Sequence, residues 1–125
     1  MTKVLIADDE EAILESTASL LELFGFDVVV VSEPSDIIDT MRRERPDVLL
    51  QDVRMPDFDI NRHLERLHAD PELRSVPVII FSAYVNAREI AQQVGADGAI
   101  EKPFDPEDLR DVIERVVTSR PTPAD

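Results

Sequence analysis

The sequence predicts an α/β fold in which helices cover both faces of a five-stranded parallel sheet. Short apolar runs recur along the chain, and each is followed by a segment whose apolar residues have helical spacing. One of these runs, Pro46–Val53, is almost continuously apolar, which is typical of a strand buried on both faces. Strands that alternate with helices are typical of parallel sheets, because each helix carries the chain back to the start of the next strand.

The strands are predicted from the apolar runs in chain order. They are Val4–Ala7, Phe26–Ser32, Pro46–Val53, Val76–Ala83 and Gly98–Lys102.

The helices are predicted from apolar spacing and from their end signals. The first has an apolar stripe of Ile13, Leu14, Thr17, Leu20, Leu21 and Phe24, and Gly25 follows where a left-handed residue ends a helix. The others are a helix over 34–45 opened by Pro34, a short polar one over Asn61–His68, one over Ala87–Val94 that ends at Gly95, and a last one from near Pro106. His63 and His68 are expected on the surface of the third helix.

Length and composition indicate one domain over residues 1–119, followed by a polar tail or linker stub at 120–125. The net charge of −14 argues against nucleic acid and anionic membranes as direct partners. The absence of cysteine excludes disulfides and thiolate metal ligands. No apolar run approaches the roughly 20 residues of a membrane span, and the N-terminus lacks the pattern of a signal peptide. A cytoplasmic location is therefore expected.

Charged and polar side chains stand where the predicted strands end. Asp8 and Asp9 follow the first strand, Asp52 lies at the end of the third, Ser82 at the end of the fourth and Lys102 at the end of the fifth. The carboxyl ends of parallel strands share one edge of the sheet, and ligands bind in the crevice at that edge. Three carboxylates, a hydroxyl and an ammonium are therefore expected to converge.

Three clustered carboxylates repel one another unless a cation neutralises them. Oxygen donors without histidine or cysteine suit Mg²⁺. Lys102 and Ser82 would then hold the oxygens of a phosphoryl group, and Asp52 would be the nucleophile that accepts it. The simpler alternatives are that Asp8 and Asp9 only cap the first helix, and that Lys102 is an ordinary surface lysine.

Four segments in this order resemble the receiver domain of two-component response regulators: "LIADDE", "VLLQDVRMPD", "PVIIFSA" and "GADGAIEKPF". The resemblance extends from about Lys3 to Thr118. It implies the flavodoxin-like, doubly wound form of the predicted fold, and a signalling module rather than an enzyme.

The resemblance also implies roles for individual residues. Asp52 would be the phosphoacceptor, Ser82 the switch hydroxyl and Lys102 the partner of the phosphoryl group, with a cis peptide bond before Pro103. The implied ligands of Mg²⁺ are Asp8, Asp9, Asp52 and the backbone carbonyl of Arg54.

The implied partners are proteins. A sensor histidine kinase or a phosphotransfer protein would supply the phosphoryl group, and a downstream protein would bind about residues 87–118. Homodimer formation stays open, as does the choice between a stand-alone regulator and a piece of a longer one. By the same resemblance, Arg54 and Tyr84 flank the path of hydrolytic water, so slow self-dephosphorylation is expected.

Three positions depart from the family pattern. Ile60 replaces the usual glycine, so the third helix is expected to start late or to be loose. Ala99 replaces the usual Tyr or Phe, so a readout by that ring cannot operate. Gln51 precedes Asp52 and is expected to point to the opposite face of the sheet, where it needs a hydrogen-bond partner. The first two departures favour an alternative function: a degenerate receiver that acts as a scaffold without phosphorylation.

Other enzymes and binding proteins with this strand layout fit less well. A dehalogenase-like phosphatase needs a second aspartate where Arg54 stands, and a flavodoxin would place FMN phosphate against the acidic stretch "DDEEA". A dinucleotide-binding fold needs a glycine-rich turn after the first strand, and the sequence has none.

Overall fold

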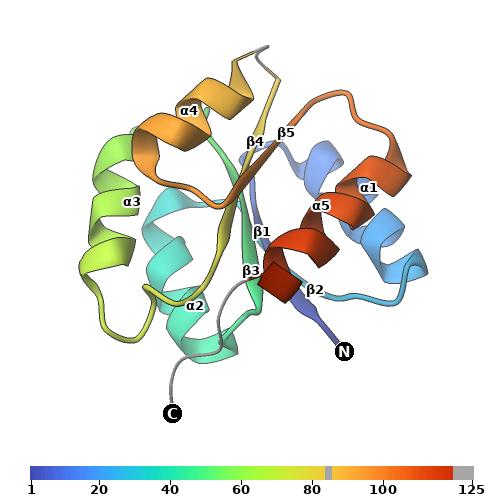
Figure 1. The fold of residues 1–125 in the computed structure, drawn as a ribbon, viewed down its shortest axis with the longest axis horizontal. Coiled ribbons are helices and arrows are strands. Elements are labelled where there is room, and N and C mark those ends of the chain that lie inside the picture. The colour runs from blue at the N-terminus through green and yellow to red at the C-terminus, as the bar shows by residue number, and fades with distance from the viewer. Residues whose placement is uncertain (84–85, 120–125) are drawn as a thin grey trace.

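The computed structural model describes residues 1–83 and 86–119 and has one sheet of parallel strands. The strand order β2-β1-β3-β4-β5 is that of a doubly wound, flavodoxin-like sheet, as predicted (Figure 1). The strands are β1 (Lys3–Ala7), β2 (Asp27–Val31), β3 (Val48–Asp52), β4 (Val78–Ser82) and β5 (Gly98–Glu101).

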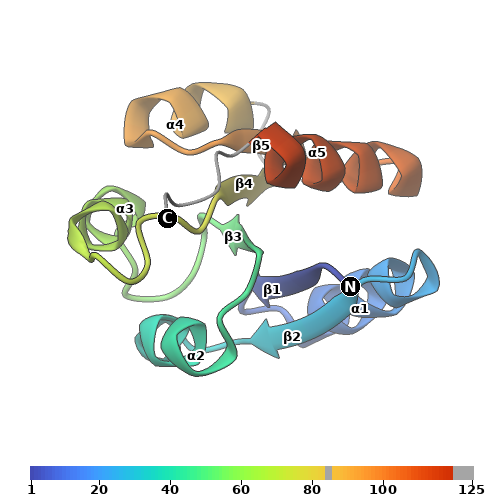
Figure 2. The same cartoon turned by 60° about the horizontal axis from the view of Figure 1, so that its bottom comes forward.

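Helices cover both faces of this sheet (Figures 1 and 2). They are α1 (Glu11–Leu23), α2 (Ile37–Glu44), α3 (Ile60–Ala69), α4 (Ala87–Val94) and α5 (Pro106–Ser119). One face carries α2, α3 and α4, and the other carries α1 and α5, because the apolar side chains of the two helix sets belong to separate core clusters.

The two core clusters follow from the alternation of side chains along the strands. On β3, Leu49 belongs to the cluster under α2, α3 and α4, while Leu50 belongs to the cluster under α1 and α5. Every residue of β3 and β4 is buried, which confirms that the central strands are covered on both faces. The resulting rigid sheet holds the strand ends at fixed positions.

The ends of two predicted helices need comment. Gly25 has φ +93°, so the left-handed residue expected after α1 is confirmed. The predicted start of the second helix at Pro34 is wrong, because Pro34–Asp36 forms a separate 3-10 turn and α2 begins at Ile37.

The expectation that the third helix starts late is also wrong. α3 begins at Ile60, because the side chain of Asp59 accepts hydrogen bonds from the backbone N–H groups of Asn61 and Arg62. The left-handed residue in the preceding loop is Asp57, with φ 53°, a conformation that aspartate tolerates better than most side chains.

His63 on α3 is buried, with 6% of its surface exposed, so its predicted surface position is wrong. It shares the inner face of the helix with Leu64 and Leu67. Its ring lies 5.0 Å from the ring of Phe58, and no hydrogen-bond partner is found for its Nε2 atom among the described residues.

Some sequence predictions fall outside the described residues. These are the polar tail at 120–125 and the part assigned to Tyr84 in slow dephosphorylation. Among residues 1–83 and 86–119, no helix has both the length and the apolar character needed to cross a bilayer.

Candidate functional site

The direction of the chain winding reverses between β1 and β3, because β2 lies beyond β1 while β4 lies beyond β3. Such a reversal leaves a crevice outside the carboxyl ends of the two strands. Asp8 and Asp9 follow β1 directly, and Asp52 is the last residue of β3. The fold therefore brings the three predicted carboxylates to the same place.

The three carboxylates form a compact oxygen cluster. Asp8, Asp9 and Asp52 each offer one oxygen, and these oxygens all lie within 4.8 Å of one another. Asp8 is fully buried and Asp52 is 4% exposed, while Asp9 is open to solvent. Carboxylate oxygens with solvent access on one side suit a hard divalent cation that keeps some of its waters.

Asp8 also has a local role. Its Oδ1 atom accepts a hydrogen bond of 3.0 Å from the backbone N–H of Glu10, just before α1. This bond forms a turn before the helix, and the N-cap residue Glu10 has no side-chain cap, so the alternative that Asp8 only caps α1 is not supported. The other oxygen of Asp8, Oδ2, accepts a hydrogen bond from the ammonium of Lys102.

Lys102 supplies the positive charge of the crevice. Its Nζ atom lies 2.6 Å from Asp8 Oδ2 and 3.6 Å from Asp52 Oδ1, and only 15% of its side chain is exposed. The backbone N–H of Lys102 donates to the carbonyl of Ser82 at 2.7 Å, which ties the end of β5 to the end of β4. The peptide bond between Lys102 and Pro103 is cis, as the family resemblance implied.

The environment raises the pKa of Asp52 to about 6. Burial is the main cause, because it disfavours the charged form, and the negative charges of Asp8 and Asp9 act in the same direction. The Lys102 ammonium and a hydrogen bond from the Arg54 backbone oppose the rise. A nearby positive charge would therefore lower the pKa of Asp52 and favour its charged form.

The crevice above Asp52 has a volume of about 560 Å³. Asp9, Asp52, Arg54 and Lys102 line it, together with Glu10, which the sequence analysis did not single out. Ser82 is different: its side chain is fully buried at the end of β4, and its neighbour Ala83 lines the crevice instead. The structure thus brings together the predicted acidic residues and Lys102, with Ser82 beneath the rim.

Comparison with known proteins decides the family. The model of the response regulator receiver domain matches residues 4–114, which is most of the chain. The chain belongs to the response regulator receiver domain family. The resemblance noted in the four sequence segments is therefore confirmed, as is the class of function in two-component signalling.

Two curated relatives show how far the likeness to other receiver domains extends. The chain is 28% identical to the response regulator Rre1 of Synechocystis over 98% of its own length and 54% of the relative. It is 32% identical to the probable transcriptional regulator ycf27 of Guillardia theta over 92% of its own length and 45% of the relative. The receiver domain thus spans about half the length of these proteins.

A solved structure of similar fold is the receiver domain of the sensor histidine kinase PA1611 of Pseudomonas aeruginosa. It has a TM-score of 0.84 and 25% identity, and the match covers 94% of this chain and 98% of that one. That crystal structure holds a magnesium ion coordinated in its active site cleft. The alternative of a degenerate, phosphorylation-independent scaffold gains no support from these comparisons.

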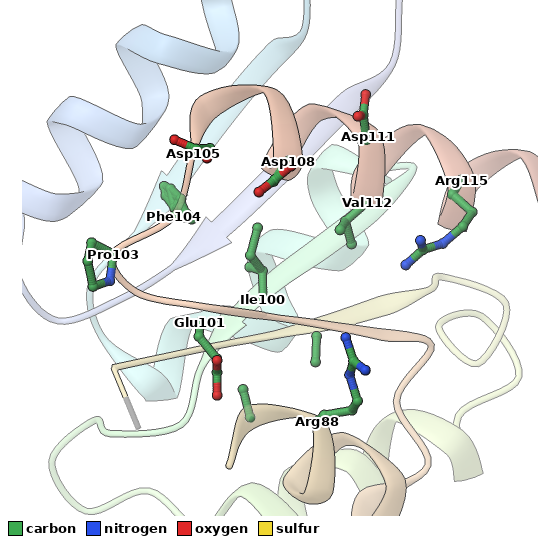
Figure 3. A pocket seen from close by; sticks show the side chains of 12 residues that line it. Arg88, Ile100, Glu101, Pro103, Phe104, Asp105, Asp108, Asp111, Val112 and Arg115 are labelled. Carbon is green, nitrogen blue, oxygen red and sulfur yellow. The ribbon is translucent and has the colours of Figure 1, made fainter. Parts of the chain in front are cut away.

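A second hollow lies on the side of the receiver domain formed by α4, β5 and α5 (Figure 3). This groove has a volume of about 930 Å³. Ala87 and Ala99 contribute only methyl groups to it, while Arg88 and Arg115 reach it from α4 and α5. The small side chain of Ala99, where the family resemblance implied a Tyr or Phe, lines this groove.

Gln51 points away from Asp52, as expected from the alternation along β3. Its Nε2 atom donates to the carbonyl of Asp52 at 2.8 Å and approaches the sulfur of Met55 at 3.4 Å. The amide nitrogen of Gln51 therefore has the hydrogen-bond partner that the sequence analysis predicted. No partner is found for Oε1 among the described residues.

Proposed function

We propose that this receiver domain accepts a phosphoryl group on Asp52, with Mg²⁺ held by Asp8, Asp9, Asp52 and the backbone carbonyl of Arg54. The single observation that carries the proposal is the position of Lys102. Its ammonium lies between Asp8 and Asp52, at the edge of the cluster of three carboxylates. Lys102 also lines the crevice, so one side of it is open to a ligand there. This arrangement places an ammonium beside the carboxylate that would accept the phosphoryl group.

The donor set fits the metal. All three side-chain ligands are carboxylates within 4.8 Å of one another, and two of them are nearly or fully buried, so a cation removes their mutual repulsion. When bound, Mg²⁺ supplies charge neutralisation at one phosphoryl oxygen. Lys102 would neutralise a second oxygen, and we assign the third to the Ser82 hydroxyl after a local movement that brings it to the rim.

The phosphoryl donor is proposed to be a phosphohistidine of a sensor kinase or phosphotransfer protein. A carboxylate oxygen of Asp52 attacks the phosphorus atom, an O–P bond forms, and the P–N bond to the histidine breaks. The electron pair of that bond leaves with the imidazole nitrogen. Burial raises the pKa of Asp52 to about 6 while Lys102 opposes the rise, so this carboxylate is mostly charged at pH 7 and can act as the nucleophile. A bound cation would favour the charged form further.

The output of the domain is proposed to be a protein contact at about residues 87–118. This segment includes α4, β5 and α5, which surround the groove beside Ala99. The backbone hydrogen bond between Lys102 and Ser82 connects β5 to the strand that faces the phosphoacceptor. A shift at the rim of the crevice would reach the groove along this connection.

The test is intact-mass analysis after incubation with acetyl phosphate and Mg²⁺. The expected result is one added phosphoryl group in the unmodified protein, none in Asp52→Asn and none when EDTA removes the metal. A matched control is Asp57→Asn. Asp57 is an exposed carboxylate on the neighbouring loop, and asparagine tolerates its left-handed backbone conformation. This variant should be phosphorylated normally, and a phosphorylated Asp52→Asn protein would contradict the proposal.

A further inference from the structure

The aromatic ring of Phe81 lies directly against the ammonium of Lys102. The Nζ atom is 4.3 Å from the centre of the ring, and Phe81 is completely buried. A cation above an aromatic face is attracted by the electron density of the ring, and the attraction grows when both groups are shielded from water. Lys102 therefore has a neutral neighbour as well as two charged ones.

The fold explains how the ring reaches this place. In the sheet, Phe81 on β4 is aligned with Asp52 on β3, so the two side chains project from the same face at the same level. The rings of Phe104 and Phe81 pack in an edge-to-face arrangement, with 5.4 Å between the ring centres and 60° between the ring planes. The pairing of β4 with β3 and the contact with Phe104 thus fix the ring of Phe81 beside Asp52.

A bound cation would weaken the attraction of Asp8 for Lys102 but not that of Phe81. Asp8 holds the ammonium at 2.6 Å, but the same carboxylate belongs to the cluster of candidate metal ligands. A cation in that cluster competes with Lys102 for the charge of Asp8. The ring of Phe81 is not a metal ligand and carries no net charge, so a cation in the cluster does not neutralise its attraction for the ammonium.

We infer that Phe81 is a positioning residue for phosphoryl binding, whose ring keeps the Lys102 ammonium over the crevice when the carboxylates are occupied by metal. This inference rests on the role proposed above for Lys102. It assigns to Phe81 a function in addition to its place in the core cluster under α1 and α5.

The test distinguishes the effect of the ring's electron density from the effect of its volume. Phenylalanine analogues with one, two and three fluorine atoms are incorporated at position 81, since fluorine withdraws electron density from the ring face with little change in shape. The readout is the affinity for beryllofluoride, a phosphoryl mimic, measured by calorimetry at saturating Mg²⁺. The affinity is expected to fall stepwise, by roughly threefold to tenfold over the series, as for a partly shielded cation–π contact. The affinity for Mg²⁺ alone should not fall.

Phe24 provides a matched control. Its ring packs against the same core cluster and also lies under a cation, with the guanidinium carbon of Arg110 5.1 Å from the ring centre. The same fluorinated series at position 24 should leave beryllofluoride affinity unchanged. A flat series at position 81, or an equal fall at both positions, would overturn the inference.

The failure of this inference is distinguishable from the failure of the proposed function. If the series at position 81 is flat while Asp52→Asn abolishes phosphorylation, only the role of Phe81 is lost. If Asp52→Asn is still phosphorylated, the proposed site itself is wrong, whatever the fluorinated proteins show.

Discussion

The crevice and the groove of this receiver domain are built in different ways. The crevice consists of charged groups at strand ends, and its position is dictated by the order of the strands. The groove consists of side chains on α4, β5 and α5, and its shape depends on residue volumes such as that of Ala99. The comparison indicates that topology places the carboxylate cluster, whereas individual side-chain volumes shape the groove.

The largest expected effect concerns the crevice. Lys102→Ala should slow phosphorylation by acetyl phosphate by about a hundredfold or more, the usual loss when one preorganised charge-stabilising donor is removed. The measurement is the time course of phosphoryl incorporation by intact mass.

The control for Lys102→Ala is the other lysine of the sequence. Lys3 also forms an ion pair, at 3.3 Å with Glu44, but at the opposite end of the sheet. Lys3→Ala should react at the normal rate. Equal losses in the two variants would show that Lys102 acts through general stability, and would remove the distinction between the crevice and the rest of the surface.

A second prediction uses a buried group that lies in neither region. Burial is the main cause that lowers the pKa of His63 to about 4 from 6.5, with Arg66 adding to it. The neutral form is favoured in the fold, so its contribution to stability is complete above pH 6.5 and is lost as the pH falls toward 4. Between pH 7 and about pH 4.5 this loss amounts to about 2 kcal/mol.

The measurement is urea unfolding across this pH range for the unmodified protein and for His63→Leu. The difference between the two proteins isolates the histidine, because Asp52 titrates in both. The difference should change by about 2 kcal/mol in favour of the variant at acid pH. A difference independent of pH would show that the histidine is not held neutral by burial.

The third prediction concerns how much the buried charge of Asp52 lowers the free energy of unfolding. The pKa of Asp52 is raised to about 6, above the value of 3.8 for a free carboxyl. Stability from this group is therefore present below pH 3.8 and is lost as the pH rises through 6. Without Mg²⁺ at pH 8, Asp52→Asn should be more stable by up to about 3 kcal/mol, the free energy that corresponds to a rise in pKa from 3.8 to about 6.

Chemical denaturation with and without Mg²⁺ checks this prediction. The metal should stabilise the unmodified protein and reduce or reverse the advantage of the variant, since bound cation favours the charged carboxylate. If Asp52→Asn is less stable than the unmodified protein in the absence of metal, the crevice is not a strained, functional site.

The convergence of the three carboxylates and Lys102 could be predicted from the sequence because the relevant pattern is local. Asp8 and Asp9, Asp52, Ser82 and Lys102 each stand at the end of an apolar run, and the carboxyl ends of parallel strands lie at one edge of the sheet. Burial of His63 was not predictable in the same way. Its spacing with Leu64 and Leu67 places it on the inner face of α3, but a histidine in a polar helix gives no sign of burial.

Contacts that depend on strand register were also missed. The contact between Phe81 and Lys102 requires the alignment of β3 with β4 and of β4 with β5, which residue spacing alone does not give. The start of α3 differs from the prediction for a simpler reason. The side chain of Asp59 caps the helix and offsets the effect expected of Ile60.

The smallest expected effect concerns the groove. Ala99→Tyr adds a ring to a surface hollow, away from the carboxylate cluster, so the rate of phosphorylation should stay within about twofold of normal. The rate is measured by the same mass time course. A loss as large as that of Lys102→Ala would show that the groove and the crevice do not vary independently.

The most direct test of the account asks whether the crevice controls the groove. NMR spectra would follow the methyl groups of Ala87 and Ala99 while beryllofluoride is added in the presence of Mg²⁺, in the unmodified protein and in Asp52→Asn. The account predicts that both methyl signals shift in the unmodified protein and stay in place in the variant. Signals that move at the crevice while Ala87 and Ala99 remain unchanged would contradict it.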